Sequence, residues 1–317
     1  MKLKSASSTH EVGLGDKIRQ GLILASMHLQ GRRGLTFSWL DGYVREYNDA
    51  LRAYGRPKLE ASRVLEIGFG ARPHRLVWLH NSDINVWGVD LDKPLLELSP
   101  KSVFDIVRRN GPERAIKSIT RYCISDKHQW RTMASEIGAR GRTFLMPKER
   151  LIVADAASGD FWAKVGQMDF IYSEDVFEHI PGESLEILVE QMARALRPNG
   201  LALIRPMVFT GICGGHQLEW YPHTLDQHIE RRTAPWEHLR QNRYPADTYL
   251  NRLTRQDYVD IFEKHFHILE NKAMKPDRGE SFITSAIRAE LSRYSDEELF
   301  SNSVRFILEP KQNSARQ

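Results

Sequence analysis

Two glycines and an aspartate are the first residues whose types and spacing suggest chemistry. Gly68 and Gly70 follow an apolar run and precede a helical pattern that Pro73 opens. Glycines at a strand-to-helix turn let the backbone approach a ligand closely, and free N–H groups there favour an anionic group. Asp90 ends the next apolar run, twenty residues beyond Gly70, and a carboxylate at that edge can accept two hydrogen bonds from a ribose diol. The pattern therefore predicts a nucleotide-bearing ligand.

Polar residues also follow two later apolar runs. Asp155 comes after the third run, where its carboxylate could hold an exocyclic amine; Ser173 follows the fourth run, and His179 lies shortly beyond it. A nicotinamide dehydrogenase would share the glycine loop and Asp90. Against that alternative, Pro73 occupies the position at which the dinucleotide fingerprint has its third glycine.

A parallel sheet must position these residues, because short apolar runs alternate with helical patterns. We expect strands over 64–67, 84–89, 150–153, 168–172 and 201–204, and a helix over 182–196 that Pro198-Asn199-Gly200 ends. Further along, the patterns predict a helix over 254–265, a strand over 266–269, a helix over 280–293 and a strand over 304–308. The expected fold class is α/β, with a doubly wound sheet.

The chain divides by pattern into a helical segment over 1–60, with helical runs at 18–29 and 37–51, a domain over 61–310 and a tail over 311–317. Two stretches exceed a minimal βα unit. The first is an insertion over about residues 100–145, with extra helix over 112–137. The second, over about 210–250, follows the fifth strand and is rich in His, Trp, Tyr and Arg, so we expect a lid or substrate platform there.

Together these segments resemble the class I S-adenosylmethionine-dependent methyltransferases. The matching segments, which span about residues 63–207, are Val64 to Gly70, Val89-Asp90, Ala154-Asp155-Ala156, Asp169 to Ile180 and Leu196 to Leu201. The resemblance implies a Rossmann-like sheet of seven strands whose last two strands are antiparallel at one edge, with S-adenosylmethionine as cofactor. One departure is Arg72-Pro73, where many members have glycine or another small residue.

The resemblance also implies roles for individual residues. The backbone of Gly68 and Gly70 would meet the amino acid part of the cofactor, with Glu66 near its ammonium group. Asp90, with Leu91 beside it, would bind the ribose.

Three more residues complete the implied cofactor site. Asp155 and Ala156 would border the adenine, and Ser173 would pass close to the sulfonium. Methyl transfer from a sulfonium is an in-line displacement, so the enzyme mainly aligns the acceptor atom and excludes water.

Two histidines are candidates for a general base, which an alcohol or carboxylic acid acceptor would need. His179 follows the fourth strand, and His216 lies in the segment 210–250, as does His223; a helix-capping role is the alternative for His179. The spacing of His216, Glu219 and His223 also suggests a metal. Because Pro222 interrupts any helix that would align them, and no fourth ligand is clear, no metal site is predicted. Acidic residues after the fourth strand are expected at a helix start.

The segment 210–250 offers two more groups. Its aromatic residues could stack on a sugar ring or planar metabolite, or could pack in a core; they are Trp220, Tyr221, Trp236, Tyr244 and Tyr249. Its arginines could meet phosphate or carboxylate, although solvated charge is the favoured interpretation; they are Arg231, Arg232, Arg240 and Arg243.

Composition limits the partners. Lys plus Arg number 45 and Asp plus Glu number 41, a net charge of +4 that falls short of a dense cationic face, so nucleic acid is not the expected partner. Cys123 and Cys213 are too few for a disulfide framework, and the start of the chain lacks the apolar core of a secretory signal. We expect a cytoplasmic protein without membrane segments. The helical N-terminus and residues 102–141 offer surfaces for a homodimer.

The leading functional hypothesis is O-methylation of a small-molecule or glycan hydroxyl. An RNA methyltransferase is the alternative within the enzyme class, since the isoelectric point lies near 9.0. Ser173-Glu174-Asp175-Val176 stands where nitrogen-modifying enzymes of nucleic acids often carry an Asn- or Asp-Pro-Pro-Tyr motif. A third hypothesis is a catalytically silent methyltransferase fold that serves as a scaffold or ligand sensor.

Overall fold

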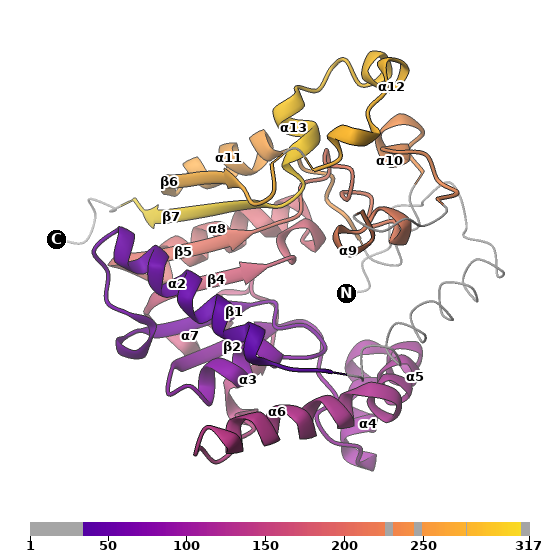
Figure 1. Ribbon diagram of the computed structural model, residues 1–317. Coiled ribbons are helices and arrows are strands. Elements are labelled where there is room, and N and C mark those ends of the chain that lie inside the picture. Colours follow the sequence, from indigo (N-terminus) through magenta and orange to yellow (C-terminus); the bar gives the residue numbers. More distant parts are fainter. Residues whose placement is uncertain (1–33, 226–230, 244–248, 277, 312–317) are drawn as a thin grey trace. The chain divides into compact units, whose positions relative to one another are not determined.

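Seven strands form one sheet in the computed structural model, which describes residues 34–225, 231–243, 249–276 and 278–311 (Figure 1). The strands are β1 Arg63–Ile67, β2 Asn85–Asp90, β3 Leu151–Val153, β4 Met168–Glu174, β5 Leu196–Arg205, β6 Phe266–Ala273 and β7 Val304–Pro310. The α-helices are α2 Asp41–Ala53, α3 His74–His80, α4 Pro100–Asn110, α5 Pro112–Arg121, α6 Lys127–Ala139, α7 Gly159–Val165, α8 Gly182–Ala195, α9 Pro222–Leu225, α10 Glu237–Arg240, α11 Arg255–Glu263, α12 Ser285–Glu290 and α13 Asp296–Ser301. No helix within these ranges is both long and apolar enough to span a bilayer.

The strand order is β3-β2-β1-β4-β5-β7-β6. β1 pairs in parallel with β2 and β4, and β2 pairs in parallel with β3, whereas β7 pairs antiparallel with β5 and β6. The expected Rossmann-like sheet with an antiparallel pair at one edge is therefore confirmed. Because parallel strands point the same way, the segments after β1, β2 and β3 leave the sheet at one edge.

The chain divides into two compact units. The described residues 34–172 with 195–201 form the first, called here the N-terminal unit. Residues 173–194 and the described residues from 202 onward form the second, the C-terminal unit.

Three helices of the N-terminal unit form the insertion (Figure 1). Pro100 begins α4, where the Ser99 side chain accepts a hydrogen bond from the Ser102 N–H, and Gly111 separates α4 from α5 with φ of 87°. The helix expected over 112–137 is present as α5, the π-helical segment η3 Tyr122–Asp126, and α6. A π-helical turn within a helix often marks a functional position, and η3 brings Asp126 to such a position, as described below.

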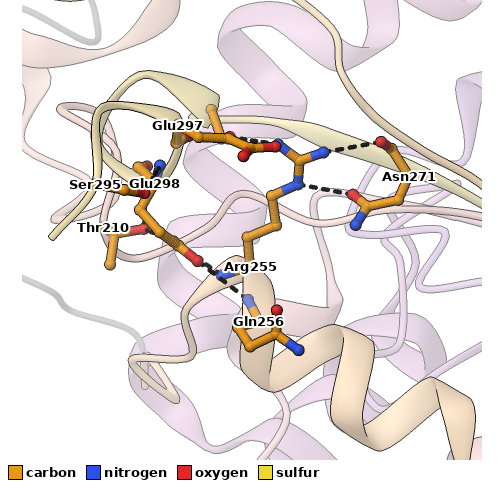
Figure 2. A network of polar contacts seen from close by, with 8 residues as sticks. Thr210, Arg255, Gln256, Asn271, Ser295, Glu297 and Glu298 are labelled. Carbon is orange, nitrogen blue, oxygen red and sulfur yellow. Dashed lines mark hydrogen bonds and ion pairs between the residues drawn. The ribbon is translucent and has the colours of Figure 1, made fainter.

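A polar network joins three elements of the C-terminal unit (Figure 2). The Glu298 carboxylate on α13 accepts hydrogen bonds from the Thr210 hydroxyl (2.7 Å) and from the N–H groups of Arg255 and Gln256, the first residues of α11. Arg255 in turn pairs with Glu297 (2.8 Å). Glu298 thus satisfies backbone donors that the start of a helix leaves without partners, and it fixes the segment after β5 to the C-terminal helices.

Several boundaries differ from the expected ones. The helix expected over 280–293 is a 3₁₀ turn, Glu280–Phe282, followed by α12, because Thr284 is extended and its side chain caps α12 by accepting from the Ile287 N–H. The strands expected over 201–204 and 266–269 are longer, as β5 and β6. Helices α7 and α13 were not expected, since each is too short for a clear periodic pattern. The helix expected over 18–29 lies outside the described residues.

Protonation of a buried histidine should make the stability of the N-terminal unit depend on pH. The His74 ring lies edge-on to Phe37 (5.0 Å between centroids) and Trp130 (4.7 Å), and its Nε2 has no hydrogen-bond partner among the described residues. Burial, and then Arg72 and Arg121, lower the pKa of His74 to about 3. The unfolded state, with a pKa of about 6.5, therefore binds the proton first as the pH falls, and stability decreases below pH ~6.5.

We expect this single group to reduce the free energy of unfolding by about 1.4 kcal/mol between neutral pH and pH ~5.5. Urea denaturation at several pH values measures it, with His74→Gln as the matched variant that does not titrate. If both proteins lose the same stability over that interval, His74 is not the responsible group.

Candidate cofactor and catalytic site

The glycine loop follows β1 and is held against β2. Gly68 and Gly70 have φ of 78° and 67°, a left-handed backbone that a side chain would strain. Gly68 donates its N–H to the Val89 carbonyl (2.8 Å), and Gly70 donates its N–H to Asp90 Oδ2 (2.7 Å). The expectation that these two N–H groups are free for a ligand is therefore wrong, because the Asp90 carboxylate turns toward the loop. A Cβ at Gly70 would meet no heavy atom within 4 Å, so the loop is open there.

Asp90 ends β2 and accepts a second backbone hydrogen bond, from the Asp92 N–H to Oδ1 (2.8 Å). Burial raises the pKa of Asp90, and the N–H groups of Asp92 and Gly70 oppose the rise. Each carboxylate oxygen keeps a lone pair beyond the one that its backbone partner uses. Leu91, the next residue, is 66% exposed. An acid with remaining acceptor capacity beside an exposed apolar side chain suits a ribose and its base.

Glu66 is paired inside the unit. It is 1% exposed, and Arg75 on α3 donates Nε to its Oε1 (3.0 Å). The Arg75 guanidinium also lies over the rings of Tyr43 (4.8 Å) and Tyr172 (5.5 Å). Burial raises the pKa of Glu66, while Arg75 lowers it in part. This ion pair ties α3 to β1, and a direct contact of Glu66 with the cofactor stays a prediction.

Gly88 in β2 supports the loop from within the sheet. A Cβ there would lie 2.3 Å from Leu76 Cδ1 and 2.8 Å from Phe69 Cδ1. Phe69 is the residue between the two loop glycines, so only a glycine at position 88 lets it pack inward. The signal in the sequence was a glycine within a strand, which often marks such a close approach.

Asp126 was missed in the sequence and holds the tail of the glycine loop. It is 1% exposed and accepts hydrogen bonds from Arg72 Nε (2.6 Å) and Arg121 Nε (3.0 Å). Arg121 also donates to the Ala71 carbonyl (3.4 Å). Arg72, which departs from the family pattern, is thus paired with the Asp126 carboxylate from residues 100–145. No local spacing could have revealed it, since 54 residues separate Arg72 from Asp126.

The other predicted cofactor residues lie where their strands end. Asp155 follows β3, is exposed, and accepts the Ala157 N–H with one oxygen (2.8 Å); the Ala156 carbonyl accepts from the Trp162 indole (2.7 Å). Ser173 is buried in β4. The structure thus brings the glycine loop, Asp90 and Asp155 to the carboxyl ends of neighbouring strands in the N-terminal unit.

The two predicted catalytic histidines meet in the C-terminal unit. The His179 and His216 rings are 5.0 Å apart between centroids and nearly perpendicular. His179 lies on the 3₁₀ turn η5 Phe177–His179, and its Nδ1 is 3.0 Å from the Tyr249 carbonyl. His216 has φ of 51°, and burial lowers its pKa to about 4, with His179 and His238 contributing. Its imidazole is therefore neutral at pH 7.

Glu178 joins this pair, although the sequence suggested only a helix-start role. It is 3% exposed, and burial, followed by the neighbouring Asp175, raises its pKa well above the usual range. The helix that follows begins later, at Gly182. The only sequence feature that could have indicated Glu178 was its place directly before His179, a predicted catalytic residue.

The remaining candidates of the segment 210–250 serve its own packing. Glu219 Oε2 accepts from the Arg232 and Thr233 N–H groups, which removes it from the suggested metal pattern. Trp220 and Trp236 are buried in an apolar cluster, as the core-packing interpretation holds, while Tyr249 is exposed. The side chain of His223, and all of Tyr244, lie outside the described residues.

Three of the four arginine side chains of this segment contact other protein groups. Arg231 donates to the carbonyls of Glu219, Thr224 and Leu225 and lies over Trp220. Arg240 pairs with Glu290 (2.6 Å), and Arg243 approaches Glu237 (3.8 Å). These contacts favour structural roles over a phosphate or carboxylate site.

A glycine loop after β1, acids after β2 and β3, and a seven-stranded sheet with an antiparallel edge define the class I methyltransferase fold. The family model described as a methyltransferase domain matches residues 39–265. The chain therefore belongs to the methyltransferase-domain family, with S-adenosylmethionine as its cofactor.

Several solved structures of methyltransferases are similar to this chain at low sequence identity. A methyltransferase from Clostridium acetobutylicum has 10% identity and a TM-score of 0.43, with coverage of 92% of this chain and 98% of that one. One from Archaeoglobus fulgidus has 14% identity and a TM-score of 0.43, with coverage of 92% and 99%. The 1,6-didemethyltoxoflavin-N1-methyltransferase of Burkholderia thailandensis has 12% identity and a TM-score of 0.38, with coverage of 97% and 94%. No curated protein matches the sequence.

Proposed function

We propose that this methyltransferase acts on a hydroxyl group of a small molecule or glycan. The observation that carries the proposal is the pairing of His179 and His216 in the segments that follow β4 and β5. A neutral alcohol is a poor nucleophile until a base removes its proton, whereas a neutral amine can attack through its own lone pair. A histidine pair therefore suits an oxygen acceptor. The His179 Nδ1–H donates to the Tyr249 carbonyl, which leaves Nε2 with a lone pair.

The reaction assigns a role to each group of residues. The glycine loop, Asp90 with Leu91, and Asp155 with Ala156 would hold the cofactor, and Ser173 would lie on its sulfonium side. When bound, S-adenosylmethionine would supply the methyl group to the acceptor oxygen, with cleavage of its carbon–sulfur bond and release of a neutral thioether. The hydroxyl proton passes to a base, for which His179 is the better candidate because the low pKa of His216 makes that imidazole a weak base.

The charge and the packing support a small acceptor. A net charge of +4 over 317 residues is modest for a nucleic-acid enzyme. The side chains of Arg231, Arg240 and Arg243 are engaged within the C-terminal unit, and exposed Tyr249 remains available to a planar or sugar ring.

A labelled-methyl assay tests the proposal. The protein is incubated with S-adenosylmethionine that carries a labelled methyl group and with separate panels of phenols, sugars, amines and short RNAs. We expect label in alkali-stable ethers of a hydroxyl acceptor. Label found only in RNA or amines would contradict the proposal, and cofactor binding without transfer to any panel would favour the silent scaffold.

A further inference from the structure

A carboxylate and two imidazoles converge in the C-terminal unit. Glu178, His179 and His216 each offer one ligand atom, and these atoms all lie within 4.8 Å of one another. The three residues come from two segments, η5 and the loop after β5. Carboxylate oxygen and neutral imidazole nitrogen are ligands of first-row divalent metal ions.

Glu178 lacks the contacts that a buried carboxylate needs. It is 3% exposed, and neither of its carboxylate oxygens makes a hydrogen bond of ordinary geometry within the described part of the chain. The nearest favourable dipoles are the backbone N–H groups of Glu178 itself and Met207, while Asp175 adds a second negative charge. A buried acid without adequate partners is costly, and a cation at this position would supply the missing partner.

Each of the two histidines offers one ring nitrogen to this cluster. The His216 Nε2 atom is buried and has no partner among the residues that the structure describes. His179 donates Nδ1–H to the Tyr249 carbonyl, so its Nε2 is the unprotonated nitrogen. A histidine that ligates a metal commonly donates its other ring N–H to a carbonyl in this way, which fixes both the tautomer and the ring orientation.

Surrounding residues hold both segments in place. Asn251 Nδ2 donates to the carbonyls of Phe177 (2.7 Å) and Ile180 (3.0 Å), and the Asn251 N–H donates to the Glu178 carbonyl (2.9 Å). The turn η5 is therefore clamped at three points. On the other segment, a Cβ at Gly215 would lie 2.7 Å from His238, whose ring is anchored 2.9 Å from the Phe209 carbonyl.

We propose that Glu178, His179 and His216 bind one divalent transition-metal ion. Two imidazoles with one carboxylate favour ions such as Zn²⁺, Co²⁺ or Mn²⁺ over Mg²⁺ or Ca²⁺, which prefer oxygen ligands. Three protein ligands leave coordination positions for water or for an oxygen of a bound molecule. The ion would lie among these three ligand atoms.

A functional consequence rests on the proposed function. With the ion bound, both histidines are ligands and neither is a free base. The ion would then lower the pKa of a coordinated hydroxyl and take over the activation assigned above to His179. Metal binding itself is independent of that step and has its own readout.

Titration with Co²⁺ tests the site, because its visible absorption reports coordination by protein. The full chain, free of any affinity tag, is stripped with EDTA, dialysed and titrated with CoCl₂. We expect one saturable equivalent, a rise in melting temperature, and loss of the Co²⁺ bands on addition of ZnCl₂ but not of excess MgCl₂. His216→Ala and Glu178→Gln should each weaken Co²⁺ binding by about tenfold or more.

Two controls keep the test decisive. Glu178→Gln replaces a buried carboxyl group, which has no hydrogen-bond partner within the described ranges, by a neutral group of similar size, so the metal-free variant should melt no lower than metal-free wild type, which separates ligand loss from unfolding. His128→Ala removes an exposed histidine of α6 and should bind Co²⁺ as wild type does. Absence of a saturable Co²⁺ signal in wild type, or wild-type affinity in both cluster variants, would overturn the site.

The labelled-methyl assay, repeated after EDTA treatment, addresses the functional consequence alone. Loss of transfer to hydroxyl acceptors, with recovery on addition of Zn²⁺, Co²⁺ or Mn²⁺, would support activation by the ion. Full transfer without metal, in a protein that still binds Co²⁺, would overturn that consequence and leave the site and the proposed function standing.

Discussion

Replacing Asp90 by alanine should weaken S-adenosylmethionine binding by about 10- to 150-fold, which corresponds to about 1.5–3 kcal/mol for hydrogen bonds to a charged group. Two effects act together in this variant. The carboxylate that we assign to the ribose is lost, and the Gly70 N–H loses its partner, so the loop is less well held. Calorimetric titration with S-adenosylmethionine and with its demethylated product measures the change.

Two further variants, one at Asp90 and one at Asp155, complete this experiment. Asp90→Asn keeps an acceptor for the Gly70 N–H but removes the charge, so we expect an intermediate affinity. Asp155→Ala removes an exposed acid and should have a smaller effect. Unchanged affinity in Asp90→Ala, with the fold intact by circular dichroism, would show that the ribose lies elsewhere.

Replacing Asp126 by alanine should lower the free energy of unfolding by about 2–4 kcal/mol. Removal of one partner from a buried ion pair typically costs about 3–5 kcal/mol, and we expect somewhat less here because the Arg72 and Arg121 side chains are 23% and 22% exposed. The variant leaves two guanidinium groups close together without their shared carboxylate. Urea denaturation with the slope held in common gives the difference.

Asp49→Ala is the matched control for Asp126. Asp49 pairs with Arg52 on α2 (2.8 Å), but both side chains are about two-thirds exposed, at 66% and 67%. A surface pair of this kind contributes about 0–1 kcal/mol. Equal destabilisation by the two substitutions would mean that burial of Asp126 carries no special weight.

The sheet, and the placement of the candidate cofactor residues at the ends of its strands, could be predicted because they depend on local patterns. The runs that form β1 to β4 are short and predominantly apolar, and Gly68, Gly70 and Asp90 follow them at fixed offsets. Strand direction then brings their ends to one edge without any knowledge of distant contacts. The prediction of one helix over 280–293 was wrong, because the Thr284 cap makes α12 begin only at Ser285 despite the periodic pattern.

Contacts between distant residues could not be predicted. The helices α3, α4 and α5 lie between Arg72 and Asp126 in the chain, and nothing in the spacing of either residue indicates the pair. The engagement of the Gly70 N–H by Asp90 depends on a side-chain rotamer, which no sequence pattern encodes. Glu178 is a candidate ligand because its carboxyl group is buried. The neighbouring residue His179 did not indicate that burial.

The π-helical turn between α5 and α6 has a consequence for any attempt to reduce this enzyme to a minimal catalytic domain. Excising α4, α5 and α6 would spare every strand and both loop glycines, Gly68 and Gly70, yet it would strip Arg72 of its counter-ion and Asp92 of its partners Asn110 and Arg114. The shortened protein would keep the strands of the sheet, but the turns after β1 and β2 would be less well held. The helices α4 to α6 therefore support the two turns to which we assign the cofactor, and a transplanted domain must include both.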